Sequence, residues 1–79
     1  MYDPLYKVGS RVRIVPRKEL EEFQRVWTFH NQLQNSQLAY GDHEAIVQET
    51  GIYFGGDVLC WLKEVPGTWH ECCLKQSHD

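Results

Sequence analysis

The stretch over residues 56–74 constrains the fold more than any other part of the chain, because its pattern is that of two strands joined by a turn. Residues 58–62 (VLCWL) suit a pleated, largely buried surface, and they follow a Gly-Gly-Asp breaker. Residues 65–68 (VPGT) place proline and glycine at the central positions of a type II turn. The sequence therefore predicts that the chain reverses at 65–68 and brings Trp69 back beside Trp61 or its neighbours.

The hydrophobic period changes within the first half of the chain. Residues 10–15 alternate polar and apolar, which puts Val12 and Ile14 on one face of a strand. From residue 17 onward, apolar side chains recur every three or four positions, as on one face of a helix. This stripe consists of Leu20, Phe23, Val26, Trp27, His30 and Leu33. We therefore expect a first strand and then an α-helix over about 17–33, within a helical insertion of about 17–40.

Shorter segments complete the predicted order. A second strand is expected over 45–49, and Thr50-Gly51 should end it. The following segment, 52–54, predicts either a short strand or the far side of a hairpin loop. Residues 71–73 are predicted to form one turn of 3-10 helix. In a continuous strand Trp69 and Leu74 would point to opposite faces, and such a turn between them lets both point inward.

Length and composition restrict the class of protein. A chain of 79 residues has room for one domain with one core, to which three Trp, four Tyr and three Phe bring large buried areas. The net charge of −3 gives no long-range attraction for phosphate backbones and disfavours nucleic acid. The three cysteines lack the spacing of a disulfide framework, and no apolar run approaches the roughly 20 residues of a membrane span. We expect a soluble, cytoplasmic domain whose oligomeric state is left open.

The order of short strands with one long excursion after the first resembles a small Src-homology-3-like (SH3-like) β-barrel. Residues 8–13 (VGSRVR) are similar to the V-G-D-x-V-R opening of several such families. Residues 56–58 (GDV), Trp69 and the closing Cys-Leu at 73–74 resemble the repeat of Mind-bomb-type ubiquitin ligases. The barrel of the nitrile hydratase beta subunit and small bacterial and phage SH3-like proteins open in a similar way. The resemblance implies a single mainly β domain over 1–79, a barrel of about five strands with an α-helix after the first.

Aromatic residues are the first candidates for a binding site. Small barrels of this class commonly bind extended peptides in a groove lined with aromatic rings. We therefore expect a non-enzymatic protein-interaction module whose protein or peptide ligand contacts at least one of four residues. The four are Tyr53, Phe54, Trp61 and Trp69. The alternative is that these rings form only the core.

A small group of basic residues supports a second hypothesis, an RNA- or ribosome-associated barrel. The group consists of Arg11, Arg13, Arg17 and Lys18. The simpler interpretation is a solvated face, since charges on an exposed strand also deter unwanted strand pairing. A third hypothesis makes the chain an accessory, subunit-type barrel of a larger enzyme.

The cysteines and histidines near the end of the chain have the chemistry of zinc ligands. They are Cys60, His70, Cys72, Cys73 and His78. However, no C-x2-C pair is present, and Cys60 lies in an apolar strand where cysteine commonly acts as a small hydrophobe. Cys72 or Cys73 beside His70 also suggests a thiol nucleophile, but no orienting group or oxyanion donor is recognisable. The sequence predicts no metal, no cofactor and no enzymatic activity.

Overall fold

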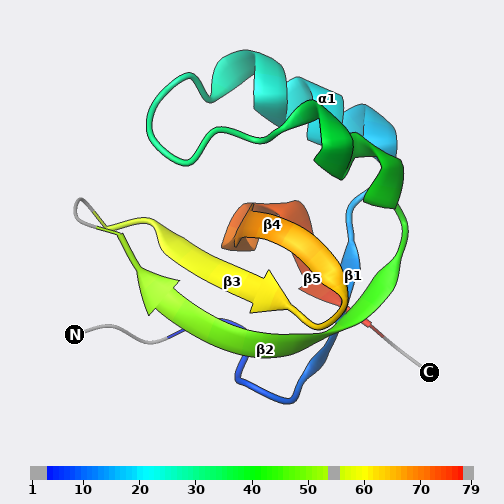
Figure 1. Ribbon diagram of the computed structural model, residues 1–79, viewed down its shortest axis with the longest axis vertical. Coiled ribbons are helices and arrows are strands. Elements are labelled where there is room, and N and C mark those ends of the chain that lie inside the picture. Colours follow the sequence, from blue (N-terminus) through cyan, green and yellow to red (C-terminus); the bar gives the residue numbers. More distant parts are fainter. Residues whose placement is uncertain (1–3, 54–55, 78–79) are drawn as a thin grey trace.

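Five antiparallel strands and one α-helix make up the part of the chain that the computed structural model describes, residues 4–53 and 56–77 (Figure 1). The strands form one sheet in the order β4-β3-β2-β1-β5. The elements are β1 (Arg11–Ile14), α1 (Arg17–Val26), the 3-10 helix η1 (Asn35–Tyr40), β2 (Glu44–Ile52), β3 (Val58–Leu62), β4 (Val65–His70), the 3-10 helix η2 (Glu71–Cys73) and β5 (Leu74–Gln76). The predicted mainly β class with one helical insertion after the first strand is confirmed.

Strand β1 lies between β2 and β5, and its alternating sequence sets its two faces. Val12 pairs with Ala45 on one side and with Gln76 on the other. Val12 and Ile14 are completely buried, whereas Arg11 and the half-buried Arg13 lie on the opposite face. The first predicted strand is therefore confirmed, together with its buried face.

Strand β2 is longer than predicted, because residues 50–51 do not end it. The strand continues to Ile52, with a register shift between Val47 and Glu49. A Cβ atom on Gly51 would lie 3.2 Å from the Trp61 ring, so glycine here lets that ring approach the backbone of the neighbouring strand. The glycine serves packing within the sheet, and the predicted break at Thr50-Gly51 is wrong.

The hairpin between β3 and β4 turns earlier than the sequence predicts. Leu62 pairs with Val65, so the chain reverses at Lys63 and Glu64, and Glu64 adopts a left-handed backbone with φ 62°. The type II turn predicted at 65–68 is therefore wrong. The return of Trp69 is confirmed, since it pairs with Cys60, the neighbour of Trp61.

Proline and glycine act in β4 as a bulge. Between the pairs Cys60–Trp69 and Leu62–Val65, β3 has one residue and β4 has three, Pro66, Gly67 and Thr68. Gly67 has φ 99°, and a Cβ there would lie 2.6 Å from Nε2 of Gln37. A proline is tolerated at such an irregularity because it has no N–H for the ladder. The positive φ that the sequence predicts for Gly67 is present, but it belongs to a bulge in an edge strand and not to a chain reversal.

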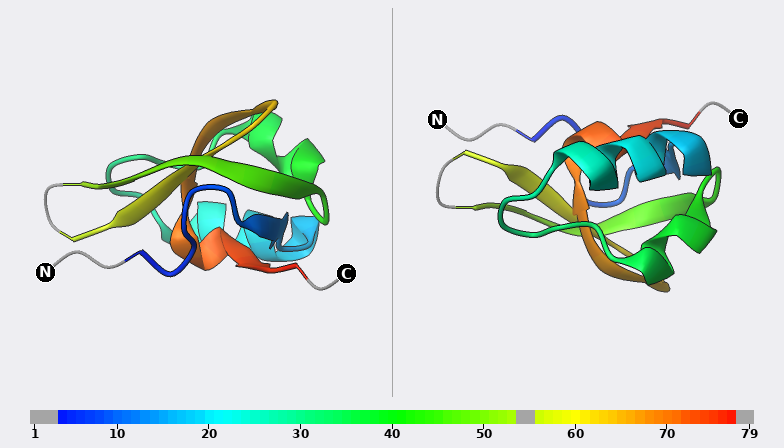
Figure 2. Two further views of the ribbon diagram at one scale, coloured as in Figure 1. Left: turned by 90° about the horizontal axis from the view of Figure 1, so that it is seen from below. Right: turned by 90° about the horizontal axis from the view of Figure 1, so that it is seen from above.

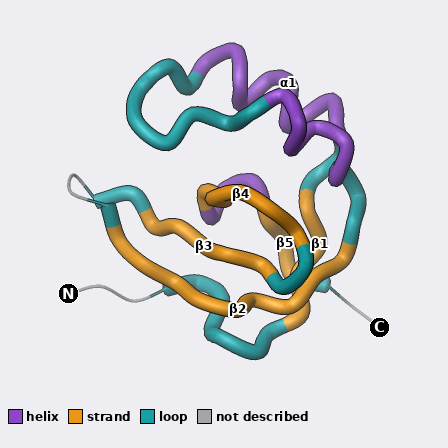
Figure 3. Tube along the Cα trace, viewed as in Figure 1, coloured by secondary structure: helices purple, strands orange, loops and turns teal. Residues whose placement is uncertain are grey.

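Helix α1 ends at Val26, so the helix predicted over about 17–33 is wrong beyond that residue. Trp27 makes the last helical hydrogen bond, to the Phe23 carbonyl at 2.8 Å, and then turns extended. Residues 26–29 are β-branched or aromatic, and such side chains lose rotamer freedom in a helix. The chain then forms a loop, drawn in teal in Figure 3, before η1 begins at Asn35. This 3-10 helix, η1, lies within the helical insertion expected over about 17–40.

The core lies between the curved sheet and a layer made by α1 and η1, which run side by side (Figures 1 and 2). Leu20 of α1 is completely buried, which docks the first turns of the helix. Trp69 is the largest fully buried side chain, and Leu74 on the other side of η2 is buried too, so the predicted 3-10 turn with two inward flanks is confirmed. None of the described helices has the length and apolar character needed to cross a membrane.

Candidate peptide-binding site

The predicted aromatic candidates occupy different environments. Trp69 is 0% exposed and therefore has no surface to offer a ligand. Trp61 is half-buried and packs over Gly51 of the adjacent strand. Tyr53 follows β2, is 40% exposed, and stacks on the His30 ring with the centroids 4.2 Å apart. Phe54 lies outside the described residues.

Tyr53 belongs to a cluster of rings that sequence analysis did not assemble. We call it the aromatic cluster, and it consists of Phe23, Trp27, Phe29, His30, Tyr53 and His70. Trp27 lies at its centre, with its ring centroid 5.0 to 5.9 Å from those of Phe23, Phe29, His30 and His70. The Phe23 and His70 rings also meet, at 5.0 Å. Separations of this size are those of favourable aromatic pairs.

Hydrogen bonds fix the loop that carries this cluster. The Trp27 indole N–H donates to the His30 carbonyl oxygen at 2.7 Å, and Gln32 Nε2 donates to the Thr28 carbonyl oxygen at 2.9 Å. The chain turns at Asn31, whose φ of 55° lies in the left-handed region that asparagine tolerates. The Asn31 carbonyl oxygen lies 2.9 Å from Nε2 of His70, which must therefore carry the proton and donate it. The end of β4 and the loop after α1 are thus joined directly.

Part of this surface is strongly apolar and exposed. Phe29 is 63% exposed, and the sequence neighbours of the cluster, Val26 and Ile52, are 53% and 54% exposed. Single exposed apolar residues are ordinary, whereas several beside one set of fixed rings are the kind of surface that interaction sites use. The exposed rings and aliphatic side chains of this surface have the chemistry to contact an apolar or aromatic group.

A groove of about 290 Å³ adjoins the cluster and shares some of its residues. It is lined by Phe23, Trp27, Gly56, Asp57, Val58, His70, Glu71 and Cys72. Asp57 Oδ2 lies 2.9 Å from Nδ1 of His30, a distance suited to an ion pair when the imidazole is protonated. The groove therefore combines aromatic faces with two carboxylates.

The cysteines differ sharply in environment. Cys72 is exposed at the edge of the groove, whereas Cys73 and Cys60 are buried. A hydrogen bond from the Cys73 thiol lowers the pKa of Cys72 to about 7, and the same bond raises the pKa of Cys73. Burial raises the pKa of Cys60 to about 11. Cys72 is therefore the thiol that ionises first, because the hydrogen bond from Cys73 stabilises its thiolate.

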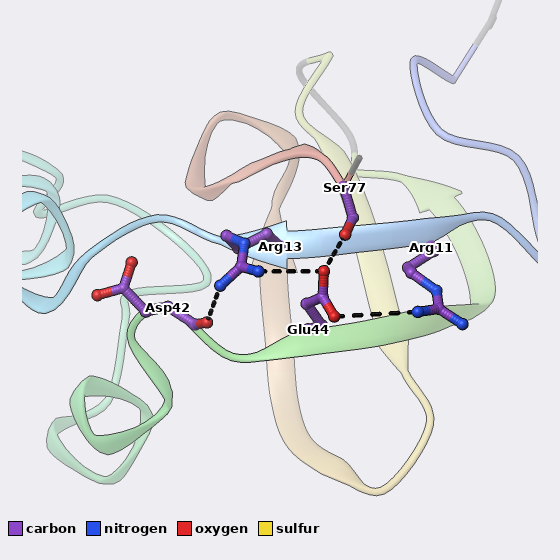
Figure 4. A network of polar contacts seen from close by, with 5 residues as sticks. All are labelled: Arg11, Arg13, Asp42, Glu44 and Ser77. Carbon is purple, nitrogen blue, oxygen red and sulfur yellow. Dashed lines mark hydrogen bonds and ion pairs between the residues drawn. The ribbon is translucent and has the colours of Figure 1, made fainter. Parts of the chain in front are cut away.

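One polar network joins two residues of the predicted basic group, Arg11 and Arg13, to Asp42, Glu44 and Ser77 (Figure 4). Arg13 Nη2 lies 3.1 Å from Glu44 Oε2, and Arg13 Nη1 donates to the Asp42 carbonyl oxygen at 2.7 Å. Arg11 Nη1 lies 3.9 Å from Glu44 Oε1. Ser77 Oγ donates to Glu44 Oε2, and this bond, with help from the arginines, holds the pKa of Glu44 below its ordinary value.

The other two basic residues belong to a different element. Arg17 and Lys18 begin α1, and Arg17 Nε lies 3.0 Å from Oε2 of Glu21 one helical turn later. Arg11 and Arg13 share one carboxylate, Glu44, and Arg17 pairs with Glu21, so part of the positive charge of this group is offset within the sheet and the helix. Less of that charge is then left to displace counterions from a phosphate backbone.

No set of three histidine, cysteine or acidic side chains within residues 4–53 and 56–77 is arranged to hold a metal ion. Cys72 and His70 both line the groove, and the Nε2–H of His70 donates to the Asn31 carbonyl oxygen, which leaves Nδ1 as the acceptor nitrogen of that ring. His78 lies outside the described residues. The absence of a metal and of enzymatic activity stays a prediction.

The helical stripe of the sequence includes Trp27 and His30, but no pattern in the chain links them to Phe29, His70 or Tyr53. Only the end of α1 at Val26 and the long-range bond between Asn31 and His70 bring these rings together. Comparison of the chain with protein-family models, with curated proteins and with solved structures gives no match.

Proposed function

We propose that this domain is a non-enzymatic interaction module that binds a peptide or partner protein through the aromatic cluster. The observation that carries the proposal is the exposure of Phe29 and Tyr53 beside rings held in place by the Trp27 and His70 hydrogen bonds. Rigid aromatic side chains lose little conformational entropy on binding and supply large contact areas. A partner that covers them removes apolar surface from water, which favours association.

We also propose that the five-stranded sheet is a barrel of the SH3-like type. Three features support this: the antiparallel order β4-β3-β2-β1-β5, the long insertion between β1 and β2, and the 3-10 turn η2 directly before β5. In this arrangement α1 lies across one end of the core through Leu20. The aromatic cluster then forms where the helix, the end of β2 and the end of β4 meet.

The test is a selection of binding peptides from a displayed random library, with two matched double variants. The surface variant Phe29→Ser/Tyr53→Ser removes exposed rings of the cluster. The control variant Leu5→Ser/Val8→Ser removes two side chains that are 69% and 62% exposed in the N-terminal segment. We expect the selected peptides to bind the surface variant at least about tenfold more weakly than the native chain, since hot-spot rings carry most of the energy of an interface.

Both variants are first compared with the native chain by thermal unfolding, so that a loss of binding is separated from a loss of folding. The control variant should retain the native affinity. Peptides that bind all three proteins equally, or that lose affinity only for the control variant, would contradict the proposed site. An accessory subunit of a larger enzyme would use the same rings for its partner chain, so the same variants apply to it.

A further inference from the structure

We infer that the groove beside the aromatic cluster receives a basic side chain, arginine or lysine, from the bound peptide. This inference rests on the proposed function and specifies the ligand of the same site. The groove brings Asp57 and Glu71 together with the rings of Phe23 and Trp27. A cation that enters the groove is attracted both by the carboxylates and by the faces of the rings. A neutral side chain lacks the charge on which both attractions depend.

The charge of the groove is one-sided. Among the described residues that line it, two are acidic and none is lysine or arginine. A second groove shares Phe23 and Cys72 with it and is also lined by Glu19 and by Glu22, which is ion-paired with Arg25. By contrast, one hollow on the β1 side has Arg11 and no acidic residue in its described lining, and another balances Arg11 and Lys63 with Glu44 and Glu64. The face along α1 and η2 is therefore the one that suits a positively charged peptide.

The Asp57 carboxylate has an oxygen without a hydrogen-bond donor, although the His30 ring stands close to it. Its side chain is only 17% exposed, and its Oδ2 atom is buried. The nearby His30 Nδ1 stands at ion-pair distance but not in hydrogen-bond geometry, so Oδ2 accepts no hydrogen bond from any described residue. A buried carboxylate oxygen without a donor is costly, and a guanidinium or ammonium group supplies donors together with the opposite charge.

The aromatic rings add a second attraction for the same group. Phe23 and Trp27 stack with an interplanar angle of 12°, so they present nearly parallel faces along the end of α1. A cation within about 6 Å of a ring centroid is attracted by the electrons of the ring, most strongly for tryptophan. Arginine in particular combines stacking on a ring with paired hydrogen bonds to a carboxylate.

The experiment titrates the native chain with Nα-acetyl-arginine amide and, separately, with Nα-acetyl-citrulline amide, in which a neutral urea replaces the guanidinium. Amide and indole chemical shifts locate the ligand. We expect the arginine compound to shift the signals of Trp27, Asp57, His70 and Glu71 and to bind at least about tenfold more tightly than the citrulline compound, as for loss of a charged hydrogen bond. Nα-acetyl-lysine amide should shift the same signals.

Two conservative variants and one control complete the test. Asp57→Asn and Glu71→Gln should each weaken binding of the arginine compound severalfold. Glu49→Gln removes the same charge from an exposed position of β2 outside the groove, and it should leave the affinity within about twofold, as expected for a screened surface charge. Equal affinity for the arginine and citrulline compounds, equal loss in all three variants, or shifts spread over other acidic residues would overturn the inference.

The outcome is separable from that of the proposed function. If library peptides without a basic residue bind the native chain and lose affinity with Phe29→Ser/Tyr53→Ser, the aromatic site stands and the basic-side-chain inference fails. If the arginine compound binds the groove but no library peptide depends on Phe29 and Tyr53, the proposed peptide surface fails. A basic residue enriched at one position of the selected peptides supports both.

Discussion

Two adjacent cysteines of η2 have opposite surroundings, and this difference governs their chemistry. Cys72 is exposed and receives a hydrogen bond from Cys73, which is 1% exposed. The bond lowers the pKa of Cys72 to about 7 from the ordinary value of 9.0. Because the thiolate is the nucleophile, the rate of alkylation should rise with pH and reach half its maximum near pH 7. Cys60, with its pKa raised to about 11, should stay unmodified in the folded chain.

The measurement is the rate of reaction with iodoacetamide at a series of pH values, with the modified residue identified by peptide mass. The variant Cys73→Ala removes the donor, so the midpoint for Cys72 should move up toward its ordinary value. Cys73→Ser keeps a hydroxyl donor and should fall between the two. A midpoint near 9.0 in the native chain, or the same midpoint in Cys73→Ala, would show that Cys73 does not stabilise the thiolate.

At the scale of elements, the bulge of β4 depends on one glycine. Gly67 has φ 99°, and a Cβ there would displace the side chain of Gln37. Gln37 is buried and uses both ends of its amide: Nε2 donates to the Thr68 carbonyl oxygen at 3.0 Å, and Oε1 accepts from the Gln34 N–H at 2.8 Å. We expect Gly67→Ala to lower the free energy of unfolding through backbone strain and through loss of this bridge between η1 and β4.

Gly9 provides the control for that substitution. Its φ is 94°, but a Cβ there would meet nothing within 4 Å, so Gly9→Ala measures backbone strain alone. We expect about 1 kcal/mol for Gly9→Ala and about 1–2 kcal/mol more for Gly67→Ala, the cost of disturbing buried hydrogen bonds. Chemical denaturation of both variants checks this. Equal losses would mean that Gln37 moves aside without penalty.

The elements that sequence predicts well are those set by local pattern. Alternation located β1 and its buried face, and the parity of Trp69 and Leu74 located η2. The turn of the β3–β4 hairpin was misplaced because Pro66 and Gly67 suit a bulge as well as a reversal, and only pairing with β3 decides between them. The helix is predicted too long because Leu33 is buried from within the loop between α1 and η1, through tertiary packing and not as part of a helical stripe.

The candidate site is predictable only in part, because contacts between residues far apart in the sequence assemble it. Tyr53 was named from its residue type, but its stacking partner His30 is 23 residues away in sequence (53 minus 30). His70 reaches the cluster through the Asn31 carbonyl, a contact that depends on a single left-handed residue. Contacts of this kind leave no periodic signal in the chain.

For the whole molecule, one side chain carries an unusual share of the stability. Trp69 is completely buried, and its Nε1 atom has no hydrogen-bond partner among the described residues, so its contribution comes from packing. Truncating a buried tryptophan costs about 3–5 kcal/mol. Small domains have little more than about 5 kcal/mol in total. We therefore expect Trp69→Ala to unfold the domain or nearly so.

Chemical denaturation measures the free energy of unfolding of Trp69→Ala and of the control Trp61→Ala, in which the same side chain is removed from a different environment. Trp61 is half-buried, so its truncation should cost about 1–2 kcal/mol, in the ordinary range of single substitutions. A loss below about 1 kcal/mol for Trp69→Ala would contradict its place at the centre of the core.

The two outer strands of the sheet are β4 and β5. β4 is interrupted by Pro66, which has no N–H, and its Thr68 carbonyl is already bonded to Gln37. β5 has only three residues. Neither offers the long row of free N–H and C=O groups that a second chain needs to add a strand. The irregularity of β4 and the shortness of β5 thus leave little backbone at either outer strand for edge-to-edge pairing with a second chain.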